Sequence, residues 1–459
     1  MTRAPAPAES AALGALARAG FPAALFAAVA LRLHNAFHYP PDWGFDASFN
    51  WSYIARLGRD WSLPDPEEGW STADPPLFYY AAAALLRLCR ALGDPNAALW
   101  LVPLAGTLAG LAIAWLAHRL VRVLHPEDRA RARVAACLVL FLPAQIHVSA
   151  MVNEEIWTSL LASLALFGLA TEAPARRRLS RALAVGAAAG LALLAKLTGA
   201  LALAALLASY ALEGLRQRAL RRSLWLASAA ALAGLATGGW FFARNALRFG
   251  YLQPHALAVH SRMLGMPPGE RGLLDYLYLP LSTFLDPQLL DPGLLRSVWG
   301  STFATLWFDG HRYFLPLGGA GVRILGTLTL LLALLPSAAF AAGCWQAWRR
   351  AFAPRTPPPR DLPLLLLVPL GLVGYAAFAW RNPSFAVLKG SSLLALTLPF
   401  SYYASGALTS WGRRSREAAA LLLLASLALA VCVLLGTSFG VFFTRDALPG
   451  LPWQEVRVP

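Results

Sequence analysis

Charged residues are scarce in this chain. Lys, Arg, Asp and Glu make up 14% of its 459 residues, whereas 58% of the residues are hydrophobic. The surface of a soluble protein of this length would carry more charge, so a soluble globular fold is excluded. Several apolar runs approach or exceed the roughly 20 residues that cross a bilayer as a helix. The sequence therefore predicts an all-α polytopic membrane protein.

Cysteine is rare, and nucleotide-binding motifs are absent. Cys89, Cys137, Cys344 and Cys432 lie in or beside apolar segments without CxxC spacing. This pattern indicates small core residues rather than a disulfide framework or a zinc site. The chain has no P-loop, no GxGxxG and no GxSxG, which disfavours a nucleotide-driven pump and a Rossmann oxidoreductase.

Lysine is the rarest charged residue, with Lys196 and Lys389 as the only two among 39 basic residues. Both are expected at external helix ends, in a Lys-Leu-Thr-Gly turn at 196–199 and a Lys-Gly-Ser-Ser turn at 389–392. A compact ammonium can hold a phosphate as a point charge. The alternative is a side chain that only reaches towards the membrane interface. Because arginine would reach equally well, the choice of lysine favours phosphate binding.

Apolar and basic segments alternate along the chain and predict its topology. Eleven segments are expected to span the membrane: 16–36, 97–118, 134–151, 155–171, 182–196, 199–214, 223–243, 317–342, 362–380, 386–408 and 417–440. Arginine-rich connections fall at 119–133, 176–181, 216–222, 349–360 and 413–416. Positively charged connections stay in the cytoplasm. The formal charge of +15 is therefore explained without a nucleic-acid partner.

This topology predicts a cytoplasmic tail (1–15), a membrane domain (16–440) and an external C-terminal tail (441–459). Large external loops are expected at 34–96 and 244–316. If the apolar run 76–92 crossed the membrane, the basic connections after it would lie outside the cell, where positively charged loops are disfavoured. We therefore expect an interfacial helix there. The loop 244–316 is expected to lie over the membrane surface as short helices, including an amphipathic stretch at 294–308.

The first external loop is acidic and contains a candidate general base. Its seven carboxylates are Asp42, Asp46, Asp60, Asp65, Glu67, Glu68 and Asp74. Asp46 lies about ten residues beyond the first span and precedes an amphipathic stretch at 47–59. Asp46 is interpreted as a general base near the membrane surface. The alternative is that it serves only as the N-cap of that helix.

Other polar residues are expected at the same membrane face. Asn153, Glu154 and Glu155 stand where one span ends and the next begins. They are interpreted either as a second carboxylate site or as a helix start, with Asn153 as the cap and the glutamates favoured by the helix dipole. Arg244 closes a Trp-Phe-Phe-Ala-Arg-Asn element at 240–245, where it could clamp a phosphate or anchor the interface. His311 and Arg312 lie in the second external loop, without the spacing of a metal site.

These motifs, in this order, resemble the GT-C superfamily of membrane glycosyltransferases. The nearest resemblance is to protein mannosyltransferases of the family 39 type. It is carried by the acidic loop with Asp46, the Asp-Pro-Pro-Leu-Phe-Tyr-Tyr element at 74–80, Glu154 with Glu155, the 196–199 turn and the 240–245 element. The resemblance implies a GT-C bundle of about 11 membrane helices with interfacial helices in the external loops.

The resemblance also implies an activity. A sugar, hexose or pentose, would pass with inversion from a polyprenyl-phosphate donor to a hydroxyl of a lipid, glycan or protein acceptor. The catalytic base would be Asp46, with Asn153, Glu154, Glu155 and Asp74 near the acceptor. The donor phosphate would be bound by basic residues that lie on the same face: Lys196, Arg244, Lys389, His311 and Arg312.

The chain departs from the family pattern at two positions. Ala47 stands where many relatives have a second carboxylate, and Asp74 stands where many have His or Lys before Pro-Pro. No cofactor is required with certainty, and a divalent metal stays an open alternative. The expected location is a bacterial inner (plasma) membrane, with the N-terminus cytoplasmic and the active site external. The alternatives are a polytopic transporter or lipid flippase, and an inactive relative that acts as a scaffold.

Overall fold

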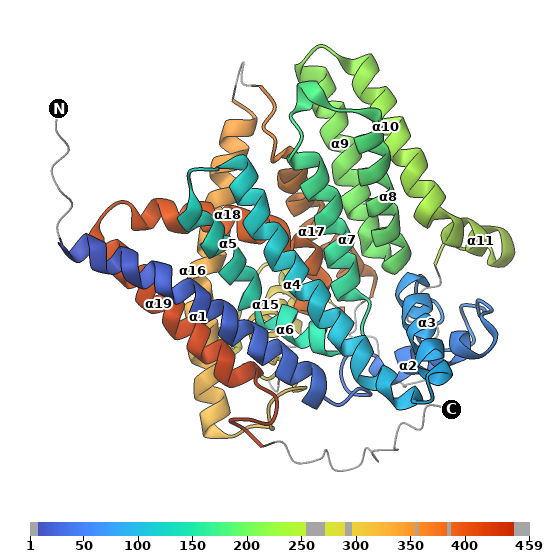
Figure 1. Cartoon of the computed structure of the whole chain (residues 1–459), viewed down its shortest axis with the longest axis horizontal. Coiled ribbons are helices and arrows are strands. Elements are labelled where there is room, and N and C mark those ends of the chain that lie inside the picture. Colours follow the sequence, from blue (N-terminus) through green and yellow to red (C-terminus); the bar gives the residue numbers. More distant parts are fainter. Residues whose placement is uncertain (1–7, 254–270, 290–295, 354–356, 383–386, 445–459) are drawn as a thin grey trace.

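A computed structural model describes residues 8–253, 271–289, 296–353, 357–382 and 387–444, with side chains from Gly20 onwards. All regular secondary-structure elements within these residues are helices. The bundle contains α1 (Ala8–His38), α4 (Ala98–Leu124), α5 (Arg129–Leu140), α6 (Pro143–Ala150), α7 (Glu155–Ala170), α8 (Leu179–Ala195), α9 (Ala200–Arg216), α10 (Leu220–Gly234), α16 (Ala320–Ala351), α17 (Leu362–Arg381), α18 (Thr397–Gly412) and α19 (Arg416–Thr437) (Figure 1).

Shorter elements connect the long helices. They are α2 (Ala47–Asp60), α3 (Leu77–Ala91), α11 (Trp240–Phe249), α13 (Ser282–Leu285), α15 (Val298–Trp307), the 3-10 helices η1 (Pro95–Ala97), η2 (Pro174–Arg176), η3 (Leu197–Gly199), η5 (Leu273–Tyr276) and η7 (Gly390–Leu396), and the π-helical turn η4 (Leu235–Gly239). In Figure 1, α2 and α3 lie at the end of the bundle opposite the turn between α9 and α10.

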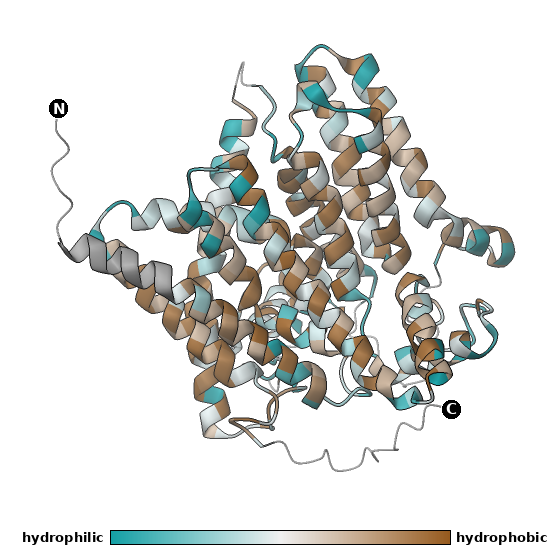
Figure 2. Ribbon diagram, in the orientation of Figure 1, coloured by the Kyte–Doolittle hydropathy of each residue, from teal (hydrophilic) through white to brown (hydrophobic). Residues whose placement is uncertain are grey.

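Apolar length confirms the prediction of an integral membrane protein. In the described part of the chain, seven helices are long and apolar enough to cross a bilayer, and α7 and α8 are shorter apolar helices. Hydrophobic residues fill the middle of the bundle, whereas hydrophilic residues gather at its two ends (Figure 2). The expected fold class is therefore correct.

Two predicted spans are less regular than expected. The segment 134–151 is broken into α5 and α6, which are bent by 53°. Pro143 begins α6, and its ring cannot continue the preceding helix. The span predicted at 386–408 is wrong in its first half, because 390–396 is the 3-10 helix η7 and the regular helix α18 begins only at Thr397. Residues 383–386 lie outside the described part.

The second external loop also differs from its prediction. The helix expected at 294–308 begins at Val298 within the described residues, and seven of the ten residues of α15 are buried. It packs against α6, α13, α16 and η7 instead of lying on the membrane surface. Its Thr302 and Thr305 side chains donate to carbonyl groups of the same helix, so they can be buried without losing hydrogen bonds.

The first external loop is closer to its prediction. The helix α3 covers 77–91, is not among the candidate spans, and packs on α2. Together α2 and α3 form a small core around Tyr53, Ile54, Leu57 and Leu86. This core holds the acidic loop against the end of the bundle.

Glycines let α8 approach α10 and η4 closely. A Cβ atom added at Gly186 would lie 2.2 Å from the carbonyl oxygen of Ala230, and one at Gly190 would lie 2.3 Å from that of Gly234. No side chain fits at these distances, so the two backbones pack directly on each other. The close contact fixes the position of α8, whose last residue directly precedes Lys196.

Candidate active site

Acidic and basic side chains from four segments meet at one end of the bundle. Asp46 precedes α2, Glu154 and Glu155 stand at the start of α7, Lys196 follows α8, and Lys389 precedes η7. These residues are far apart in the sequence, and ion-pair contacts join them in the structure. We call these five residues the charge cluster.

Lys196 is paired with two carboxylates. Its Nζ lies 2.7 Å from Oε1 of Glu154 and 2.7 Å from Oε1 of Glu155. Both glutamate side chains are almost fully buried, with 6% and 2% exposure. Buried carboxylates are costly without a partner, so the ammonium compensates charge that the fold has removed from water. The expected contact between Lys196 and a donor phosphate would compete with these two ion pairs.

Asp46 does not cap α2. The residue has left-handed backbone angles (φ 56°, ψ 15°), and its side chain accepts no hydrogen bond from the helix. Its Oδ1 instead accepts a hydrogen bond of 2.9 Å from Nε1 of Trp70. The alternative interpretation of Asp46 as a simple N-cap is therefore wrong. A left-handed non-glycine residue costs about 1–3 kcal/mol, which the surrounding contacts must offset.

Lys389 faces Asp46 from the other side. Its Nζ lies 3.8 Å from Oδ2 of Asp46, 3.9 Å from Oε1 of Glu155 and 4.5 Å from the ring centre of Phe45. Among the described residues, the ammonium forms no hydrogen bond of 3.5 Å or less, so it is held more loosely than that of Lys196. The side chain of Asp46 is 41% exposed, and that of Lys389 is 14% exposed. The pair therefore stands at the open edge of the charge cluster.

Asn153 acts as a cap and Asn50 as a link. The Oδ1 of Asn153 accepts a hydrogen bond of 2.7 Å from the backbone N–H of Glu155, as expected for the start of a helix. The side chain of Asn50 donates to the carbonyl of Val152 and accepts from Ser71 and Tyr79. Asn50 thus fixes the acidic loop to the segment that carries the two glutamates.

Asp74 lies beside the charge cluster and behaves as a weak acid. Burial and the nearby charge of Glu154 raise the pKa of its carboxyl group to about 7, although Lys196 acts in the opposite direction. The hydroxyl of Tyr79 donates a long hydrogen bond of 3.5 Å to its Oδ2. Asp74 is therefore a candidate proton donor near neutral pH.

Arg244 contacts the acidic loop rather than the charge cluster. Its Nη2 lies 3.4 Å from Oδ1 of Asp65 and donates to the carbonyl of Pro64 at 3.2 Å. The guanidinium also lies over the ring of Phe249. These contacts connect α11 to the loop that precedes α3, which indicates an anchor for the rim of the site.

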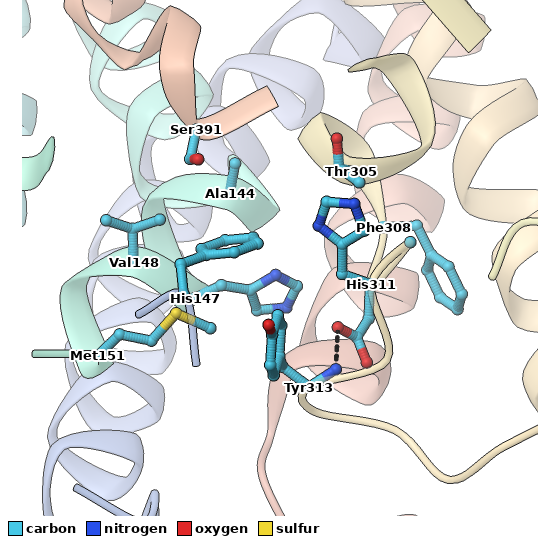
Figure 3. Close-up of a pocket in the computed structure, with 12 residues that line it drawn as sticks. Ala144, His147, Val148, Met151, Thr305, Phe308, His311, Tyr313 and Ser391 are labelled. Atoms are coloured by element: carbon cyan, nitrogen blue, oxygen red, sulfur yellow. Dashed lines mark hydrogen bonds between the residues drawn. The ribbon is translucent and has the colours of Figure 1, made fainter. Parts of the chain in front are cut away.

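His311 lines a small cavity (Figure 3), and its ring contacts that of Phe45. The cavity has a volume of about 10 Å³, enough for about one water molecule, and His147 lies on its opposite side. Burial, with the charges of Lys389 and Arg312, lowers the pKa of His311 to about 3. The imidazole is therefore neutral, whereas Arg312 is exposed beside it.

The donor set offers no evident metal site. Within the residues that the structure describes, no three His, Cys, Asp or Glu side chains are arranged to hold a metal ion. The ammonium of Lys196 occupies the position between Glu154 and Glu155 where a cation would bind. These side chains, paired with the ammonium, do not fit a metal site.

Sequence reasoning missed three residues of the site. Trp70, Asn50 and Tyr79 hold Asp46 or connect the acidic loop to α7. Trp70 and Asn50 have no sequence signal beyond their place in the acidic loop. Tyr79 belongs to the element at 74–80, but a tyrosine there is also explained as an interface residue.

Residues 73–240 match the family model of dolichyl-phosphate-mannose-protein mannosyltransferase. This segment includes Asp74, both glutamates and Lys196. No curated protein gives a significant sequence match.

Solved structures share the fold. ArnT from Cupriavidus metallidurans, bound to undecaprenyl phosphate, is 16% identical over 91% of this chain and 75% of that protein, with a TM-score of 0.51. The oligosaccharyltransferase AglB from Archaeoglobus fulgidus, in complex with an inhibitory peptide and a dolichol-phosphate, is 15% identical over 94% of this chain, also with a TM-score of 0.51. The chain spans only 56% of AglB. The resemblance predicted from the sequence is therefore confirmed: the chain has the GT-C fold, and residues 73–240 match the dolichyl-phosphate-mannose-protein mannosyltransferase family.

Proposed function

We propose that this chain is an inverting glycosyltransferase that moves a sugar from a polyprenyl-phosphate donor to an acceptor hydroxyl. The observation that carries the proposal is the pair of Asp46 and Lys389, an exposed carboxylate 3.8 Å from an ammonium at the edge of a buried charge cluster. Such a pair can accept a proton on one side and stabilise a leaving phosphate on the other.

The proton transfer follows from the position of Asp46. The acceptor hydroxyl attacks C1 of the sugar while its proton passes to Oδ2 of Asp46, and the bond from C1 to the phosphate oxygen breaks. The Trp70 N–H fixes Oδ1, which leaves Oδ2 directed towards Lys389 and available to the acceptor. A single displacement of this kind inverts the anomeric carbon.

The leaving phosphate must be stabilised by positive charge. The basic side chains of the site differ in how tightly they are already paired with carboxylates. Lys389 is the most available, because its two carboxylate contacts are 3.8 and 3.9 Å long. Arg312 is exposed next to the neutral His311, so these two residues would contact the phosphate or the sugar from the side. Lys196 and Arg244 would act through the carboxylates and the loop that they hold.

The relatives support a lipid-linked donor. The two solved structures contain undecaprenyl phosphate in ArnT and dolichol-phosphate in AglB. We propose a polyprenyl-phosphate hexose or pentose as the donor and a lipid, glycan or protein as the acceptor. By the positions of the arginine-rich connections, the site faces outwards from a bacterial inner membrane, and the membrane domain 16–440 is the catalytic domain.

The proposal is tested with the purified full-length chain, a panel of radiolabelled polyprenyl-phosphate sugars, and envelope extracts as the source of acceptor. Wild-type protein should transfer label, and the product should have the inverted anomeric configuration by NMR. Asp46→Asn should lower turnover at least about 100-fold, because a general base contributes about that much. Asp60→Asn, in the same loop, is the matched control and should stay active.

Two results would contradict the proposal. One is near-wild-type turnover of Asp46→Asn. The other is a wild-type protein that moves lipid-linked sugars across vesicle membranes without forming a glycoside, which would indicate a flippase.

A further inference from the structure

A large basic cavity lies at the end of the bundle opposite the charge cluster. It has a volume of about 820 Å³ and lies at the starts of α8 and α10. Four arginines, one tryptophan and apolar side chains line it: Arg177, Arg218, Arg221, Arg222, Trp225, Leu179, Ala219 and Leu226. The helix α8 separates this cavity from Lys196 by 17 residues, or about 25 Å at 1.5 Å per residue.

Two of the four arginines already serve the fold. Arg177 is buried and forms a bidentate ion pair with Glu213, at 2.6 and 3.0 Å. Arg222 donates to the carbonyls of Arg177 and Ala175, at 2.9 and 3.3 Å. The wall of the cavity is therefore a fixed structure in which the one buried carboxylate is already neutralised.

The other two arginines carry uncompensated charge. Arg218 and Arg221 are exposed, and neither side chain has a hydrogen bond or ion pair with any residue that the structure describes. Arg218 lies in the short turn between α9 and α10, and its backbone there is left-handed (φ 52°). The cavity thus presents two guanidinium groups that can bind an anion with several oxygens.

Apolar side chains surround the same opening. Trp225 is 58% exposed, and Leu179, Leu220 and Leu224 are 39–48% exposed. A tryptophan beside exposed leucines is typical of the level where the bilayer meets water. The ligand that fits has an anionic head for the arginines and an apolar part that continues along α8 and α10.

We propose that this cavity binds the phosphate head group of an anionic phospholipid from the leaflet opposite the candidate active site. Basic pockets between membrane helices recognise such head groups through charge and hydrogen bonds together. Trp225 and the neighbouring leucines contact the glycerol and the first part of the acyl chains. The site is separate from the proposed donor site and would serve as an anchor for this lipid.

The experiment uses the full-length chain in a neutral detergent. Binding of short-chain phosphatidylglycerol, short-chain phosphatidylcholine and inorganic phosphate is measured by native mass spectrometry and by the quenching of tryptophan fluorescence with brominated lipid. Phosphatidylglycerol should bind saturably to the wild-type chain and at least about tenfold more tightly than phosphatidylcholine or inorganic phosphate. Arg218→Gln/Arg221→Gln should weaken it by roughly fivefold per arginine, on the order of 25-fold.

The matched control removes the same charge from the same end of the bundle. Arg349 and Arg414 are exposed outside the cavity, so Arg349→Gln/Arg414→Gln should leave phosphatidylglycerol binding unchanged. Trp225→Phe should reduce quenching by brominated phosphatidylglycerol and leave binding within about twofold, since the ring shape is largely kept. If the double variant in the cavity does not fold, Arg221→Gln alone should still weaken binding about fivefold.

Three outcomes would overturn the inference. Equal loss of binding in the cavity and control variants would indicate unspecific attraction to a basic surface. Equal affinity for phosphatidylcholine would indicate a purely apolar groove. Inorganic phosphate that binds as tightly as phosphatidylglycerol would indicate a site for free phosphate.

Discussion

The indole N–H of Trp70 donates a hydrogen bond of 2.9 Å to Oδ1 of Asp46 and leaves Oδ2 facing Lys389. The contact fixes a carboxylate whose backbone is in the left-handed region and whose side chain does not cap its helix. A base fixed by one oxygen can accept a proton on the other without first reorienting.

Trp70→Phe should keep the stack with Phe49 and lose the hydrogen bond to Asp46. We expect turnover to fall by roughly tenfold with little change in KM, because the carboxylate is less well oriented in the transition state. Steady-state kinetics of sugar transfer measure this split. Trp61→Phe, in the same loop, is the control, and an equal loss of turnover there would argue against orientation through Trp70.

Lys389→Met should lose turnover about 100- to 1,000-fold while the protein stays folded. A preorganised charge near the leaving group contributes an effect of this size. Among the described residues, the ammonium makes two long ion-pair contacts of 3.8 and 3.9 Å and lies over the ring of Phe45, so little stability depends on it. Single-turnover rates and the melting temperature are compared with those of the wild type. Unchanged turnover would remove Lys389 from the phosphate site.

Lys196→Met should act mainly on stability. It leaves Glu154 and Glu155 buried without their cation, and breaking such a pair costs about 3–5 kcal/mol. Adding Glu155→Gln to this variant should restore part of the stability, because one unpaired charge is removed. Chemical unfolding of the single and double variants measures the rescue.

The sequence alone predicted that both lysines bind the donor phosphate. If they contact the same phosphate, the two single variants should lose turnover alike, and the double variant should lose less activation energy than their sum. The ion pairs of Lys196 lead to a different expectation. If Lys196→Met were as stable as the wild type and matched Lys389→Met in turnover, the equal roles predicted from the sequence would hold instead.

Asp74→Asn should change how stability depends on pH. The pKa of Asp74 is raised to about 7 in the folded chain, from 3.8 in the unfolded one. Between these values the folded state binds more protons, so this group makes the protein less stable as the pH rises from about 4 to 7. The slope is at most about 1.4 kcal/mol per pH unit. The variant should therefore gain stability relative to the wild type as the pH rises.

Melting temperatures of the two proteins between pH 5 and 8 measure this difference. The neutral His311 contributes in the opposite direction, because its lowered pKa makes the folded chain more stable as the pH rises towards 6.5. Comparing the variant with the wild type cancels that contribution. A difference that does not change with pH would mean that Asp74 is ionised throughout.

The sequence by itself determined the class of the protein and grouped the candidate site residues at one end of the bundle. Apolar length predicts membrane helices because each must satisfy its backbone hydrogen bonds inside the bilayer. The two lysines and the 153–155 motif stand where helices end or begin, so local periodicity was enough to place them on one face. The order of motifs was enough to predict the GT-C resemblance.

Only the tertiary structure decided the partners of these residues. The pairing of Lys196 with Glu154 and Glu155 depends on the close packing of α8 beside α7 and α10. The burial of α15 depends on the space between α6, α16 and η7. Sequence patterns describe one helix at a time, whereas these outcomes depend on distances between helices, which no local pattern contains.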